Sequence, residues 1–341
     1  MDYKRKYLKY KTKYLHLSKI QSGGTIEYVN YEIPFEGGKI FLNTETNNKI
    51  LVLIYRSSGN TNIPQQFNTA RLDLLQNERP NVLKYIDITT INDINGTINK
   101  YFSKLRRHPT DNYYILDLGL NEFDFLENLI IKNNRNILLF NSLPFNITDT
   151  HKKDMIYNIF EGYKYYIYNE QLPIKITIKN IIIQYDNQNL NVKIIPFDIN
   201  STIDIGQPLD LKAEPIFAPE EIRSIIVHEQ RGVLINEKIC VYFLGKIFHY
   251  ILSNGQRVYS MIGMFQLMSQ MESPNAVLEY NNFEVSPELQ QFKDLTMQML
   301  QKNPDNRPTL DDISNALFRL KQPLIKPARI TTRQDDNDDR E

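Results

Sequence analysis

Cysteine and histidine are the residue types best suited to act as nucleophiles, proton carriers or zinc ligands, and this chain uses both sparingly. Its one cysteine, Cys240, lies in an apolar segment of helical period, where a thiol normally serves as a small core residue. The five histidines are scattered and show no metal-ligand spacing: His16, His108, His151, His228 and His249. A single cysteine also excludes a disulfide framework and favours a reducing compartment. We therefore expect Cys240 to pack in a core.

The predicted secondary structure changes along the 341 residues, from mainly strands to mainly helices. Strand patterns dominate residues 27–88, where two strands joined by a polar turn are predicted in KIFLNTETNNKILVLIYR, and a later strand is predicted in YYILDLGL. A helix that ends before Pro80 is predicted in QQFNTARLDLLQ. Further helices are predicted in DMIYNIFEGYKYYIY, KICVYFLGKIFHYIL, ELQQFKDLTMQML and TLDDISNALFRL, and a strand pair in NIIIQYDNQNLNVKIIPF. This order predicts the α+β class.

The two ends of the chain differ from its body. Residues 1–24 are basic and place tyrosines on one face of a predicted amphipathic helix: Tyr3, Tyr7, Tyr10 and Tyr14. Gly23-Gly24 ends that helix, and residues 325–341 are predicted to be an acidic disordered tail. Lys+Arg and Asp+Glu are both 40, so no nucleic-acid partner is predicted. No apolar run reaches the ~18 residues of a transmembrane segment.

Several short motifs occur in a distinctive order. They are NIIIQYDNQNLNVKIIPF, FAPEEI, KICVYFLGKIFHYILSNG and MLQKNPDNRPTLDDI. Together they resemble the protein kinase family over roughly residues 30–322. The resemblance implies a two-lobed fold, with a β-rich N-lobe over residues 25–118 and a helical C-lobe over residues 119–324. It also implies a structural, buried ion pair between Glu220 of the Ala-Pro-Glu motif and Arg307.

The resemblance also identifies positions at which kinases carry out phosphoryl transfer, with a lysine, a base-like aspartate and metal-holding carboxylates. Tyr55 stands at the lysine position. Lys175, counted back from Asn180, stands at the base position, and Pro196 stands at the metal-aspartate position. A lysine cannot accept the substrate's proton, and loss of a general base alone typically costs ~10²–10⁴ in rate. No catalytic residue is intact at these positions, which implies a pseudokinase.

Three residues are weak candidates for binding a nucleotide or a metal. Gly38 matches the last glycine of the kinase glycine-rich loop, although a two-glycine turn is also common in hairpins. Asn180 could contact a nucleotide or hold its own loop by hydrogen bonds. Asp198 lies two residues after Pro196 and would face a similar side of an extended strand, so a shifted alignment could place its carboxylate at the metal position. It could also simply begin a polar turn.

Three functions remain open from the sequence. The leading one is an inactive kinase-like scaffold or regulator that binds a host or viral protein and needs no cofactor. The alternative is a divergent, active serine/threonine kinase that uses ATP and magnesium, with Asp198 for the metal and Lys39 or Lys49 for phosphate. The third is a structural virion component.

The N-terminal segment suggests the source of the chain. MDYKRKYLKYKTKYLHLSKIQSGG resembles the N-termini of many proteins of giant DNA viruses in the mimivirus group. This resemblance implies a location in the host cytoplasm or in the virion. The segment could dock onto a membrane surface or partner through its basic face, could be a tag processed at Gly23-Gly24, or could be a solvated extension.

Overall fold

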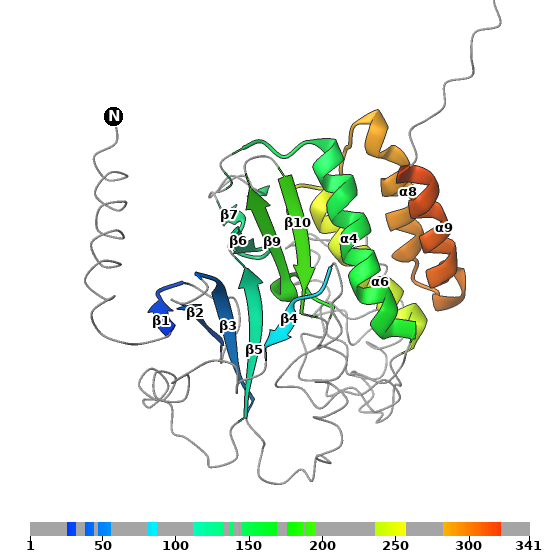
Figure 1. Cartoon of the computed structure of the whole chain (residues 1–341). Helices are drawn as coiled ribbons and strands as arrows, with labels where there is room; N and C mark the ends of the chain where they lie inside the picture. Colours follow the sequence, from blue (N-terminus) through cyan, green and yellow to red (C-terminus); the bar gives the residue numbers. More distant parts are fainter. Residues whose placement is uncertain are drawn as a thin grey trace, which may run out of the picture.

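The computed structural model of the chain has the mixed α+β architecture that the sequence predicts (Figure 1). A five-stranded antiparallel sheet comes first in the chain, and helices cover one side of a second, three-stranded sheet. The structure describes residues 26–31, 38–43, 47–55, 81–86, 112–119, 121–132, 137–139, 143, 145–168, 176–186, 189–195, 236–256 and 282–321.

The first sheet has five antiparallel strands in the order β1-β2-β3-β5-β4. The strands are β1 (Ile26–Val29), β2 (Gly38–Asn43), β3 (Lys49–Tyr55), β4 (Lys84–Ile86) and β5 (Asn112–Gly119). The predicted hairpin is confirmed, since Ile40 of β2 pairs with Leu51 of β3. The strand predicted in YYILDLGL is β5, which lies between β3 and β4.

The second sheet has three antiparallel strands in the order β10-β9-β6. They are β6 (Glu122–Phe125), β9 (Ile181–Asp186) and β10 (Asn189–Ile194). The predicted pair β9–β10 is confirmed, with Ile194 opposite Ile181. Strand β6 was not predicted, and neither was the small hairpin of β7 (Ile130–Lys132) and β8 (Ile137–Leu139).

Four predicted helical segments are confirmed as α4 (Asp149–Tyr168), α6 (Glu237–Leu252), α8 (Gln290–Met299) and α9 (Leu310–Lys321). Short 3-10 turns at Ile178–Asn180, Pro287–Leu289 and Pro304–Asn306 lead into β9, α8 and α9. Helix α4 packs on β10, and α6 packs against both α4 and α8 (Figure 1). Most residues of α6 are buried, so it forms the centre of the helical part.

Three predicted features lie outside the described residues. They are the N-terminal helix of residues 1–24, the helix predicted within residues 65–76 and the acidic tail of residues 325–341. Among the described helices, none combines the length and the apolar character needed to span a bilayer.

Candidate functional site at the junction of the two sheets

The predicted site residues are only partly within the described structure. Gly38 is the first residue of β2, and Tyr55 is the last residue of β3, where it pairs with Asn112. Asn180 ends the 3-10 turn before β9. The other predicted residues lie outside the described part: Lys175, Pro196, Asp198 and Glu220.

Asn180 closes the open end of the β9–β10 hairpin. Its side-chain Nδ2 donates to the carbonyl oxygen of Ile195 at 3.1 Å, and the Ile195 amide donates to the Asn180 carbonyl oxygen at 2.8 Å. The Asn180 side chain is buried, so its amide hydrogen bond is costly to lose. The sequence left two roles open for Asn180, contact with a nucleotide and holding its own loop by hydrogen bonds. These contacts support the second role.

The two sheets are joined along the chain where β5 ends at Gly119 and β6 begins at Glu122. We call the region around this connection the junction. Gly119 has φ of +69°, in the left-handed region that glycine adopts most easily. A Cβ atom at Gly119 would meet no atom within 4 Å. Backbone conformation, and not lack of space, therefore explains the glycine.

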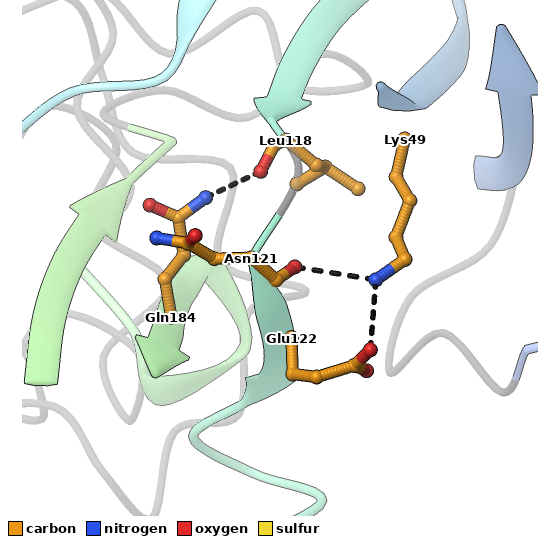
Figure 2. Close-up of polar contacts among 5 residues, drawn as sticks. All are labelled: Lys49, Leu118, Asn121, Glu122 and Gln184. Carbon is orange, nitrogen blue, oxygen red and sulfur yellow. Dashed lines mark hydrogen bonds and ion pairs between the residues drawn. The ribbon is translucent and has the colours of Figure 1, made fainter. Parts of the chain in front are cut away.

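Two side chains brace the connection, one from each sheet (Figure 2). From β9, the buried Gln184 donates its Nε2 to the Leu118 carbonyl oxygen at 2.5 Å. From β3, the Lys49 Nζ donates to the Asn121 carbonyl oxygen at 3.2 Å and lies 3.4 Å from Glu122 Oε1. The bracing contacts hold the end of β5 and the start of β6 in one relative position.

The two braces should differ in their contribution to stability. Gln184→Leu leaves the buried Leu118 carbonyl without this donor, and we expect it to lower the free energy of unfolding by about 1–3 kcal/mol. Lys49→Met removes a contact to Glu122, whose side chain is 72% exposed, and should cost no more than about 1 kcal/mol. Urea denaturation of both variants measures the difference, and equal losses would contradict this ranking.

A third contact joins the sheets where the chain leaves β1. The Tyr31 hydroxyl donates to Asp124 Oδ1 of β6, and the Tyr31 ring centre lies 5.0 Å from that of Phe123 and 6.1 Å from that of Phe125. Asp124 Oδ1 also accepts from the Phe125 amide at 2.9 Å. No sequence signal marks Tyr31 or Asp124 as a pair, because neither lies in a motif and the two are 93 positions apart.

Burial shifts the pKa values of this pair. It raises the pKa of the Asp124 carboxyl, although the hydrogen bonds from Tyr31 and Phe125 partly oppose the rise. It also raises the pKa of the Tyr31 hydroxyl, and the hydrogen bond to Asp124 raises it further. Groups with shifted pKa values occur at functional sites and also in structural hydrogen-bond networks.

Apolar side chains continue the core across the junction. Ile40 and Leu51, which pair across β2 and β3, are 1% and 0% exposed. They belong to the same buried core as Ile183 of β9 and Val192 of β10. Among the described residues, no cluster of three or more His, Cys, Asp or Glu side chains could hold a metal ion.

Arg307 connects the helices of the C-terminal part. Its guanidinium is buried and donates to three carbonyl oxygens, those of Gln301 at 2.7 Å, Lys238 at 3.0 Å and Lys302 at 3.0 Å. It also lies 4.9 Å from the centre of the Tyr242 ring. The ion pair with Glu220 stays a prediction, because Glu220 lies outside the described residues.

Cys240 is a buried core residue, as predicted. Burial, together with the nearby Glu237 carboxylate, raises the pKa of its thiol to about 12. The thiol is therefore protonated at neutral pH and is a poor nucleophile.

Comparison with known proteins identifies no relative: no protein-family model matches the chain, and no curated protein matches it. Any functional assignment must therefore be argued from the residues and their positions.

Proposed function

We propose that the chain is a catalytically inactive, kinase-like protein of a giant DNA virus that binds a host or viral protein as a scaffold or regulator. The observation that carries this proposal is Tyr55 at the end of the third strand, where an active kinase has its phosphate-pairing lysine. A tyrosine supplies no cation for the phosphates. Lys175 and Pro196, at the base and metal positions of the motif alignment, support the same conclusion.

The order of the described elements supports the two-lobed part of the proposal. A β-rich unit comes first, and the β9–β10 hairpin then follows Asn180 directly. The buried helix α6 comes next, and Arg307 lies between α8 and α9 with its side chain bonded back to α6. These segments thus form the kinds of element that the kinase-like motifs imply at their positions.

The position of Lys49 favours the inactive function over the active alternative. Lys49 begins β3 and Tyr55 ends it, so the two lie about 20 Å apart along the strand at about 3.3 Å per residue. The Lys49 ammonium group is also engaged with Asn121 and Glu122. Lys39 pairs with Val52 within the sheet, and its side chain lies outside the described part.

Nucleotide binding tests the proposal directly. Addition of magnesium and ATP should leave the midpoint of thermal unfolding unchanged, because the cation, the base and the metal carboxylate are all replaced. A competent site at a ligand concentration of 100 times Kd would gain about 2.7 kcal/mol. An active protein kinase in the same buffer serves as the positive control.

A phosphorylation assay separates the inactive from the active function. The purified chain should transfer no phosphate from ATP to a generic protein substrate. If it did, and if Asp198→Ala or Lys49→Met abolished the transfer, the active-kinase alternative would replace our proposal. Mass spectrometry of purified virus particles tests the third function, since a structural virion component must be present there in many copies.

A further inference from the structure

We propose that Tyr31 and Asp124 form a clasp that holds the end of β1 on β6, and that separation of the two sheets begins with release of this clasp. The inference does not require the kinase relationship, because it depends only on how the two sheets are joined.

The five-stranded sheet is joined to the rest of the structure in different ways at its two edges. Near the β4 edge, the Leu83 amide donates to the Ile194 carbonyl oxygen at 3.2 Å, and the Ile194 amide donates to the Asn81 carbonyl oxygen at 3.0 Å. A parallel bridge pairs Val82 with Ile194 at the same place. These contacts are made by backbone atoms. Helix α4 packs closely on the same place, because a Cβ added at Gly162 would lie 2.9 Å from Ile194 Cδ1.

At the opposite edge, β1 has a different kind of attachment. There the Tyr31 side chain makes the contact with β6, through its hydroxyl bond to Asp124 and its ring contacts with Phe123 and Phe125. One side chain can rotate away without breaking a β-ladder, whereas the β4 edge cannot separate without loss of backbone pairing. Opening should therefore start at the β1 edge and pivot about the β4 edge.

Opposing terms limit the net free energy that holds the clasp closed. The hydroxyl–carboxylate hydrogen bond and the aromatic contacts favour closure. Burial of the Asp124 carboxylate opposes closure, because the charge leaves water. A contact with such opposing terms is easier to release than an apolar contact of the same area.

The charge on Asp124 couples the clasp to pH. In the described part of the chain, the titratable groups near Asp124 are Tyr31 beyond β1, Glu122 on β6 itself and Tyr185 of β9. Burial raises the pKa of Tyr185, and the Glu122 and Asp124 charges raise it further. Lys49 of β3 lies above the Phe123 ring. Because closure raises the pKa of Asp124, the closed state binds a proton more tightly than the open state. Closure is therefore favoured below that raised pKa and weakened as pH rises through it.

Hydrogen exchange of the full chain, read by mass spectrometry, tests the clasp. Tyr31→Phe keeps the ring and removes only the hydroxyl, and it should speed exchange in residues 26–31 and at the Phe125 amide about tenfold. Exchange in α4 and α6 should not change. Tyr28→Phe is the matched control, since Tyr28 lies on β1, three positions before Tyr31, and its hydroxyl bonds to the exposed Asn30.

A second measurement uses the wild-type chain and Asp124→Asn. After correction for intrinsic base catalysis, wild-type exchange in residues 26–31 should be faster at pH 7 than at pH 4, and Asp124→Asn should remove this difference. If Tyr31→Phe speeds hydrogen exchange equally in every helix and strand, the variant is globally destabilised, and the proposal is overturned. An effect no larger than that of Tyr28→Phe, or a pH difference that persists in Asp124→Asn, would overturn it as well.

Discussion

Arg307→Ala should lower the free energy of unfolding by about 3–5 kcal/mol, which is a large loss for a single substitution. The substitution removes a buried guanidinium that donates to the carbonyl oxygens of Gln301, Lys238 and Lys302. Those oxygens lose charge-assisted hydrogen bonds, and Tyr242 loses its stacked cation. Typical domains have only about 5–15 kcal/mol of total stability, so much of the protein would unfold near 37 °C.

Chemical denaturation of the Arg307 variants measures this loss. Arg307→Lys retains the charge but lacks the planar fork, so it should recover only part of the stability. Arg319→Ala is the matched control, because Arg319 is an exposed arginine of α9 whose Nε bonds to the Asn315 carbonyl oxygen. If Arg307→Ala cost no more than Arg319→Ala, the role assigned to this arginine would be wrong.

Gly245→Val should destabilise the packing of α6 on α8 by about 1–3 kcal/mol or more. A Cβ atom at Gly245 would lie 2.9 Å from Met299 Cβ and 3.2 Å from Leu300 Cγ. The position of a Cβ follows from the backbone, so a change of side-chain rotamer cannot relieve the first contact. The two helices would have to separate, with loss of the apolar contacts between them.

Calorimetry or urea denaturation of Gly245→Val gives the cost, with Lys246→Val as the control. The control introduces the same β-branched residue one position along α6, at a partly exposed site. Valine has a lower helix propensity than lysine but a higher one than glycine, so helix propensity lowers the stability of the control and cannot explain a loss in Gly245→Val. A loss in Gly245→Val no larger than that in Lys246→Val would contradict the prediction, because the close approach of α6 and α8 would then cost nothing.

Local elements were predictable wherever the residue pattern is long. The period of α6 spans 16 residues and indicates its buried character, and the β9–β10 pair has apolar runs around a polar turn. Strand β6 was missed because it has only four residues, and because its partner β9 begins more than 50 positions later. Nothing local marks EFDF as the third strand of that sheet.

The candidate site was predictable only where a motif carries it. The motif order marked Asn180 as a candidate binding residue and Arg307 as a structural one, but it did not indicate that Asn180 closes a hairpin through Ile195. It also assigned Lys49 to an alternative phosphate site, whereas the structure places this lysine on the connection between the sheets. The residues at the catalytic positions are visible in the sequence, and their role in function stays a proposal.

By itself, the sequence determined the helices and strands with long periods, the burial of Cys240 and the residue types at the motif positions. These properties depend on neighbours within a few positions, where period and turn residues act directly. Only the tertiary structure decided that Tyr31 meets Asp124, that Gln184 and Lys49 brace one connection, and that Arg307 joins the segment between α8 and α9 to α6. Such contacts join residues far apart in the chain, so they depend on how sheets and helices pack and not on any local pattern.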